Sequence, residues 1–110
     1  MIFINKGRLL ENIVFLELLR RGREVYYFSG KNECDFLVKE GTQITEAIQV
    51  AYELNNENYK REIAGLSEAM RIFSIGKGVL LIFENSNNFT EELPENITII
   101  PVYKWLLEVN

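Results

Sequence analysis

Two runs of alternating residues between positions 33 and 52 predict a pair of strands joined by a turn at Gly41. In the first run Cys34, Phe36 and Val38 share one face and alternate with the residues of the other face: Glu33, Asp35, Leu37 and Lys39. In the second run the larger side chains share one face (Ile44, Ile48, Val50 and Tyr52) and the smaller, partly polar ones share the other (Thr45, Ala47, Gln49 and Ala51). A period of two residues is typical of half-buried strands.

Two longer segments have the periodicity of helices. Residues 7–21 carry apolar side chains around nearly the whole circumference and stop at Gly22, so we expect a helix that is covered on more than one side. Apolar residues at steps of four and three along 59–73 predict an amphipathic helix over one face of the sheet, with Asn55 and Asn56 as N-cap candidates. We expect its polar side to face solvent: Arg61, Glu68 and Arg71.

The remaining elements complete a single domain over residues 1–110. An aromatic strand covers 24–29, and the uninterrupted apolar run 79–83 indicates a strand buried on both faces and parallel to a neighbour through the preceding helix. Residues 84–96 read as a polar surface loop, followed by a strand at 97–100 and a short helix at 102–108. The predicted class is α/β, with a mixed central sheet and the order helix-strand-strand-strand-helix-strand-strand-helix.

Composition narrows the chemistry. The chain has 110 residues, of which 47% are apolar, and no histidine, so any catalysis must use carboxylates, lysine, tyrosine or a bound metal. The sequence has no apolar run of bilayer-spanning length and no signal-peptide pattern, and its single cysteine, Cys34, suits a reduced compartment. We therefore expect a cytoplasmic protein without membrane contact.

The net charge of −4 is unevenly distributed: residues 1–31 carry +3 and the remaining 79 carry −7. The basic segment suggests a phosphate-facing edge, with nucleic-acid-binding candidates Lys6, Arg8, Arg20, Arg21 and Arg23. We expect the last three to form one exposed patch. The alternative is that these arginines favour the end of a helix electrostatically and otherwise lie in a solvated loop.

Two acids lie within the apolar pattern of the first helix. Glu11 is flanked at helical spacing by Val14 and Leu18, and Glu17 is flanked by Ile13, so either carboxylate would be partly desolvated and would need a partner. An ion pair with a nearby arginine is the alternative to a functional role for either residue.

The order of elements, with Glu11 in the first helix, Asp35 opening the second strand and Gln49 fourteen positions later in the third, resembles the PD-(D/E)XK nuclease superfamily, which has the restriction-endonuclease-like fold. Four phrases are more specifically similar to the C-terminal nuclease-like domain of archaeal and bacterial AAA-type ATPases: GRLLEN at 7–12, LLRRG at 18–22, ECDF at 33–36 and IQVAY at 48–52. That domain is distantly related to archaeal Holliday-junction resolvases. The resemblance covers about residues 6–108 and implies either a fragment of such an ATPase or a free-standing copy of the domain.

The resemblance implies a site at the sheet. Glu11 matches the helix acid, Asp35 the metal-binding aspartate, Gln49 stands where a second acid is usual and Ala51 where the lysine is usual. Glu11, Asp35 and Gln49 would share one pocket and hold Mg²⁺ if the site works. Lys60, on the following helix, is the candidate replacement for the lysine, whereas Glu46 would lie on the opposite strand face from Gln49.

The expected function is therefore a degenerate nuclease-like domain, catalytically impaired, that serves nucleic-acid binding or regulation of an associated AAA-type ATPase. One alternative is an active Mg²⁺-dependent deoxyribonuclease that uses Glu11, Asp35, Gln49 and Lys60. Another is a protein-interaction module whose apolar surface docks an ATPase domain or a second copy of the chain as a homodimer.

Overall fold

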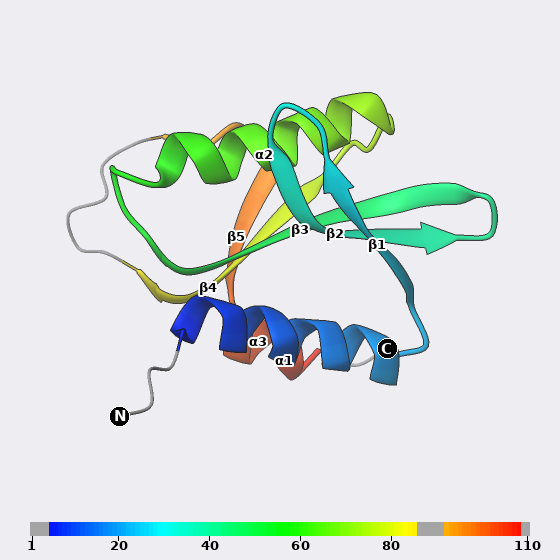
Figure 1. Cartoon of the computed structure of the whole chain (residues 1–110), viewed down its shortest axis with the longest axis horizontal. Coiled ribbons are helices and arrows are strands. Elements are labelled where there is room, and N and C mark those ends of the chain that lie inside the picture. Colours follow the sequence, from blue (N-terminus) through cyan, green and yellow to red (C-terminus); the bar gives the residue numbers. More distant parts are fainter. Residues whose placement is uncertain (1–4, 86–91, 109–110) are drawn as a thin grey trace.

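The computed structural model describes residues 5–85 and 92–108, and its elements follow the predicted order. They are α1 (Lys6–Arg20), β1 (Glu24–Ser29), β2 (Glu33–Glu40), β3 (Gln43–Leu54), α2 (Tyr59–Ile72), β4 (Gly78–Asn85), β5 (Ile97–Pro101) and α3 (Val102–Leu106) (Figure 1). The class predicted from the sequence, an α/β domain with a mixed sheet, is confirmed. The predicted loop at 84–96 begins later than expected because β4 continues to Asn85, and residues 86–91 lie outside the described part.

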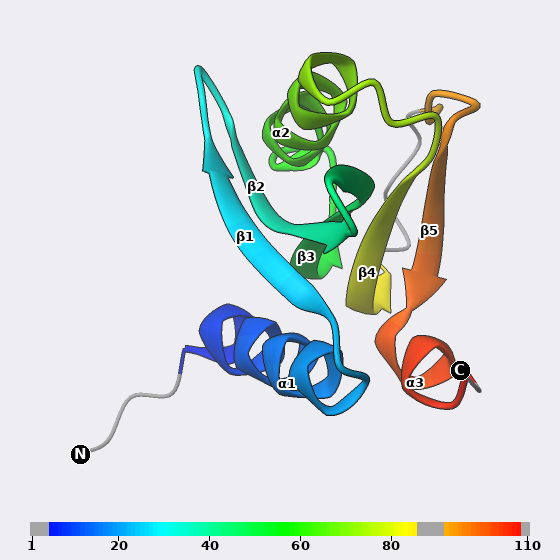
Figure 2. The ribbon, with the colours of Figure 1, turned by 90° about the vertical axis from the view of Figure 1, so that its right-hand side faces the viewer.

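A five-stranded sheet in the order β1-β2-β3-β4-β5 forms the middle layer. The first three strands are antiparallel, and β4 is parallel to both β3 and β5, which confirms the parallel pairing expected for the 79–83 run. Its burial on both faces holds for Leu80 and Leu81, whereas Phe83 is 51% exposed. Helix α2 covers one face of the sheet, while α1 and α3 lie side by side on the other (Figure 2). No helix in residues 5–85 and 92–108 combines the length and apolar character that a bilayer crossing requires.

The sheet separates two hydrophobic cores. The α2-side core contains side chains of β2, β3, β4 and α2, among them Cys34, Leu37, Ala47, Ala51, Leu66 and Leu80. The α1-side core contains side chains of α1, α3 and the other strand faces, among them Leu10, Val14, Leu18, Val38, Ile48 and Trp105. Burial of apolar surface in both layers stabilises the sheet between them.

A register shift in β2 reverses the expected alternation at Asp35. Tyr26 pairs with Leu37 and Phe28 pairs with Cys34, so Asp35 and Phe36 together oppose the single residue Tyr27. An extra residue of this kind bends a strand and redirects its side chains. The expectation that Cys34 and Phe36 share a face is therefore wrong: Cys34 packs in the α2-side core and Phe36 packs against the α1-side core.

A second shift in the pairing of β2 with β3 corrects the assignment of Ile44. Val38 pairs with Glu46 and Lys39 pairs with Ile44, which leaves Thr45 as the extra residue. Ile44 consequently packs against the α2-side core, on the opposite side of the sheet from Ile48. Strict alternation could not reveal either shift, because a bulge leaves no mark in the pattern of residue types.

The two long helices also differ from expectation. Only one side of α1 is buried, through Leu10, Val14 and Leu18, so the described chain does not cover it on more than one side. On α2, Glu68 does not face solvent: its buried carboxylate accepts hydrogen bonds from the backbone N–H groups of Lys31 and Asn32.

The start of α2 also differs in detail from the sequence-based assignment. The residue at its N-cap position is Asn58, whereas Asn55 accepts hydrogen bonds from the backbone N–H groups of Glu57 and Asn58 in the preceding turn. The side chain of Asn55 therefore stabilises the turn that leads into the helix.

Gly65 allows α2 to approach the start of β2 closely. A Cβ atom at this position would lie 1.8 Å from the carbonyl oxygen of Glu33 and 2.8 Å from Nε2 of Gln49. Both distances are far below van der Waals contact, so any side chain would push the helix away from the strand. The glycine thus fixes the distance between α2 and the strands that carry Asp35 and Gln49.

We expect Gly65→Ala to destabilise the fold by about 2–3 kcal/mol, because the added methyl group overpacks the contact between helix and strand. The direction is informative, since alanine in place of glycine normally stabilises a helix interior by about 1 kcal/mol. Urea denaturation measures the difference. Gly76→Ala is the matched control, because a Cβ there meets open space and its φ is not positive. A Gly65→Ala variant as stable as the wild type would contradict the close approach.

Candidate functional site

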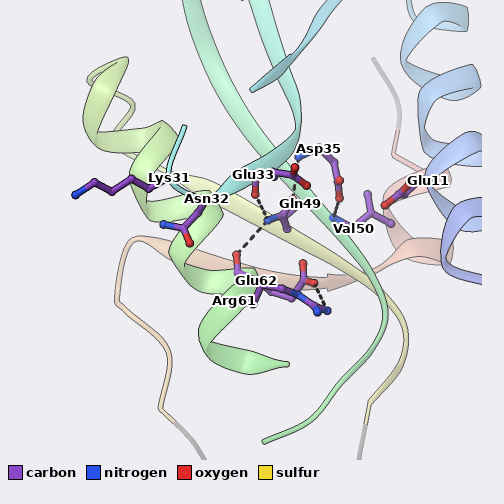
Figure 3. A pocket seen from close by; sticks show the side chains of 9 residues that line it. All are labelled: Glu11, Lys31, Asn32, Glu33, Asp35, Gln49, Val50, Arg61 and Glu62. Carbon is purple, nitrogen blue, oxygen red and sulfur yellow. Dashed lines mark hydrogen bonds and ion pairs between the residues drawn. The ribbon is translucent and has the colours of Figure 1, made fainter. Parts of the chain in front are cut away.

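The candidate site lies where β2 and β3 stop pairing through their backbones. The ladder between them ends at Phe36 and Ile48. Beyond that point the backbone N–H of Asp35 donates to Oε1 of Gln49 at 2.8 Å, and the backbone N–H of Val50 donates to Oδ2 of Asp35 at 2.8 Å (Figure 3). Two side chains therefore replace the missing backbone bonds, and both belong to residues that the resemblance places in the site.

Gln49 joins three elements through its carboxamide group. Besides accepting from Asp35, it donates through Nε2 to the carbonyl oxygen of Glu33 at 2.9 Å and to that of Glu62 at 3.2 Å. The residue is only 3% exposed. A buried amide with its oxygen and both hydrogens engaged in this way ties β2, β3 and α2 together.

A cavity of about 450 Å³ opens beside this bridge. Figure 3 shows Glu11 reaching toward it from α1, Asp35 and Gln49 from the sheet, and Arg61 and Glu62 from α2. The lining residues are Glu11, Lys31, Asn32, Glu33, Asp35, Gln49, Val50, Arg61 and Glu62. The expectation that Glu11, Asp35 and Gln49 meet in one pocket is confirmed, and four of the nine lining residues are acids.

The acids in the pocket disfavour one another's charge. Burial, together with the nearby carboxylates of Glu11 and Glu62, raises the pKa of Asp35 to about 7, although the hydrogen bond from Val50 opposes the shift. Burial also raises the pKa of Glu62, which its contact with Arg61 partly offsets. Asp35 therefore exchanges its proton near neutral pH, unlike an ordinary aspartate.

The oxygen atoms in the pocket do not fit a Mg²⁺ ion as they stand. Mg²⁺ takes near-octahedral oxygen ligands at about 2.0–2.1 Å. Here Oε1 of Gln49 accepts from Asp35, and Oδ2 of Asp35 accepts from Val50. Within residues 5–85 and 92–108, no three acidic or cysteine side chains come close enough together to hold a metal ion. The ion that the resemblance implies would require these side chains to rearrange.

Neither of the two positions considered for the active-site lysine, Ala51 and Lys60, lines the cavity. Ala51 is buried in the α2-side core, and Lys60 is exposed on α2 and does not line the cavity. Glu46 contacts Arg23 at 3.7 Å, away from the pocket. The cations that border the cavity are Lys31 and Arg61, of which Arg61 also contacts Glu62 at 3.2 Å.

Sequence reasoning missed Glu62 and Arg61 as pocket residues. A signal for Glu62 was present, because it lies three residues after Tyr59 and four before Leu66, both on the apolar face of α2. Helical spacing therefore places its carboxylate on the face that meets the sheet. Arg61 has no such signal, since its charge and its neighbours are those of an ordinary solvated position.

The arginines at the end of α1 do not form one exposed patch. Arg20 and Arg21 both bind Glu17, at 2.6 and 2.7 Å, and these contacts lower the pKa of Glu17 to about 2. The side chain of Arg21 is only 6% exposed, stacks 4.4 Å from the Trp105 ring and donates to the Trp105 carbonyl oxygen. Arg23 pairs with Glu40. The prediction of one exposed patch is therefore wrong, and Arg21 instead joins α1 to α3. The alternative predicted for Glu17, an ion pair with a nearby arginine, is confirmed.

Two further basic candidates lie at the start of α1. Arg8 borders the hollow next to Glu11, and Lys6 lies 5.3 Å above the ring of Tyr52. Nucleic-acid contact through Lys6 and Arg8, at the start of α1, stays a prediction.

The fold and pocket define an α/β domain with a mixed five-stranded sheet and an acid-rich pocket where two of its strands separate. The family model described as "Domain of unknown function (DUF4143)" matches residues 6–105, so the chain belongs to that family. It is also similar to an uncharacterized protein of Methanocaldococcus jannaschii, MJ1544, with 39% identity over 113 residues that cover 94% of the chain and 25% of that protein. The chain thus spans about a quarter of that relative. No solved structure matches at a significant level.

Gln49→Glu tests the bridge between β2, β3 and α2. The glutamate carboxylate cannot donate to the carbonyl oxygens of Glu33 and Glu62, and it adds a charge beside Asp35. We therefore expect the free energy of unfolding to fall by about 2–4 kcal/mol at pH 8. The loss should shrink toward pH 4, where the protonated group can donate again. Urea denaturation at both pH values measures it, with Gln43→Glu on the exposed start of β3 as control. If the Gln49→Glu variant is as stable as the wild type at pH 8, Gln49 does not hold the three elements together.

Asp35→Asn tests the burial of the aspartate charge. The folded pKa of about 7 lies above the usual value of 3.8, so the folded state holds this proton more tightly and wild-type stability falls as pH rises from about 4 to 8. Asparagine keeps an acceptor for Val50 without the charge. We expect the variant to be more stable than the wild type by about 2–4 kcal/mol at pH 8 and equal to it near pH 4. The exposed Glu95→Gln serves as control, and parallel pH profiles of Asp35→Asn and wild type would refute the shift.

Proposed function

We propose that the chain is a PD-(D/E)XK-like domain of the cytoplasm whose nuclease site is impaired, and that it serves as a binding module for nucleic acid or for an associated AAA-type ATPase. One observation carries the proposal: the carboxamide of Gln49 is engaged on both its oxygen and its nitrogen by the fold itself. A residue that is needed to hold β2, β3 and α2 together is not free to serve as the second metal ligand.

The charges around the pocket support binding without cleavage. Glu11, Glu33, Asp35 and Glu62 face only Lys31 and Arg61 among the lining residues, so a phosphodiester would be repelled from the floor of the pocket. Catalysis of phosphoryl transfer requires positive charge at that point. Phosphate contacts are instead expected at the rim, through Lys31, Arg61 and Arg8.

The coverage of the M. jannaschii relative supports a role within a larger protein. The match to this chain occupies 25% of that protein. A domain of this size that has lost its own chemistry can still act by binding, and a neighbouring ATPase module is the partner that the sequence resemblance suggests.

A second candidate, a Mg²⁺-dependent deoxyribonuclease, is favoured by the meeting of Glu11, Asp35 and Glu62 at one cavity. Three carboxylates from α1, β2 and α2 would supply hard ligands if their side chains moved closer together. In that case Lys60, which is exposed and does not line the cavity, would have to move its side chain into the cavity to take part.

Cleavage and binding assays separate the two candidates. We expect the chain to show no more Mg²⁺- or Mn²⁺-dependent cleavage of plasmid, duplex or branched DNA than its Asp35→Ala variant, because Gln49 and Ala51 stand at the positions where the resemblance expects the second acid and the lysine. Mg²⁺-dependent cleavage that is lost on Lys60→Ala would establish the second candidate instead.

Fluorescence anisotropy with labelled branched DNA tests the binding role. Affinity should fall steeply with salt, and Lys31→Ala with Arg61→Ala should weaken it, because rim cations would contact phosphates. Lys77→Ala, at an exposed position away from the pocket, is the matched control. Absence of DNA binding at low salt would leave regulation of an ATPase as the surviving form of the proposal.

A further inference from the structure

The outer face of α1 carries an uncovered apolar stripe. Leu9, Ile13, Leu16 and Leu19 are 52%, 39%, 56% and 48% exposed, and their steps of four, three and three residues place them along one side of the helix. Figure 2 shows that this helix forms an outer layer of the molecule. A continuous exposed apolar surface of this kind marks an interaction site rather than an ordinary solvated face.

Charge distinguishes between the partners that this stripe could accept. Glu17 has a side chain only 13% exposed and holds Arg20 and Arg21, and Glu11 points into the pocket. Because neither glutamate lies on the stripe, its middle part has no charged side chain and one polar side chain, Asn12. A strongly acidic or basic partner would gain nothing along this middle part, whereas an equally apolar and neutral helix would fit it.

The order of residues along α1 makes the stripe complementary to itself. Arg8 and Leu9 stand at one end, and Leu19 and Arg20 stand in reversed order at the other. If two copies pack antiparallel about a two-fold axis at the level of Val14, Leu9 of one copy lies opposite Leu19 of the second. A two-fold interface requires this kind of reciprocal contact.

The same arrangement accounts for the ends and flanks of the stripe. Arg8 of one copy comes beside the Arg20–Glu17 pair of the second, so a carboxylate lies between the two arginines. The short helix α3 lies beside α1, and Tyr103 within it and Leu107 at its C-cap are 59% and 77% exposed, so this neighbouring element also leaves apolar side chains uncovered.

We propose that the chain forms a two-fold homodimer in which the α1 helices of two copies pack antiparallel along Leu9, Ile13, Leu16 and Leu19. The dimer does not depend on the function proposed for the pocket, because the stripe lies on the side of α1 away from the sheet.

Light scattering coupled to size-exclusion chromatography, and sedimentation velocity over a range of concentrations, test the dimer. The wild type should have twice the 12.8 kDa mass of one chain. Leu16→Arg should raise the dissociation constant at least about tenfold, since it places a charge at the centre of an apolar seam. Ile72→Arg is the matched control: Ile72 is similarly exposed, but on α2 beyond the opposite face of the sheet. Circular dichroism should show both variants folded, because both positions are open to solvent.

Charge-pair mixing tests the orientation of the two helices. Leu9→Lys mixed with Leu19→Glu should form a heterodimer more tightly than either variant pairs with itself, because antiparallel packing brings these positions together. Leu9→Lys mixed with Leu9→Glu should not, since position 9 of the two copies lies at opposite ends. The reverse result would overturn the antiparallel arrangement.

A wild-type chain that stays monomeric at every concentration would overturn the dimer. So would a dimer that Leu16→Arg leaves unchanged and Ile72→Arg disrupts. Binding of the monomeric wild type to lipid vesicles, abolished by Leu16→Arg, would also overturn it and assign the stripe to a membrane surface.

Discussion

The candidate site depends on the three hydrogen bonds that the side-chain amide of Gln49 makes to the backbone of β2 and α2. Where β2 turns away from β3, the backbone groups of Glu33 and Asp35 would otherwise lose hydrogen-bond partners inside the protein, and a buried unpaired amide or carbonyl costs about 1–3 kcal/mol. One side chain serves both and also donates to the carbonyl oxygen of Glu62 on α2. A glutamate carboxylate at this position could not donate to the carbonyl oxygens of Glu33 and Glu62, so the connection between β2, β3 and α2 depends on the amide hydrogens of glutamine.

A different hydrogen bond, from the backbone N–H of Val50, helps Asp35 to remain buried. Its position in a strand irregularity turns the carboxylate toward the Val50 amide, and that hydrogen bond offsets part of the penalty from burial and from Glu11. The pocket thus keeps an arrangement of acids that resembles a catalytic one while the fold employs some of its donors and acceptors. An acid with a raised pKa marks a functional site only when its partners are free to act.

Much of the fold follows from the sequence because hydrophobic periodicity reports the period of each element. The order of all eight elements and the parallel pairing of β4 were predictable on this basis. The meeting of Glu11, Asp35 and Gln49 was predictable only from the family resemblance. The faces of Ile44 and Phe36 were not, since each register shift moves a residue to the other side without changing the pattern. Glu68 and Arg21 were likewise taken for surface charges, because their partners are distant backbone groups and a distant tryptophan that no local pattern indicates.

Glu68 gives the tip of the β1–β2 hairpin an unusual dependence on α2. Backbone amides at hairpin tips normally exchange with solvent quickly because nothing holds them, but those of Lys31 and Asn32 donate to a carboxylate buried under the helix. Exchange at these amides requires the tip to separate from Glu68 on α2. Hydrogen exchange at Lys31 and Asn32 therefore reports the contact between the hairpin tip and the helix layer, and the same contact restrains the rim of the pocket that the two residues form.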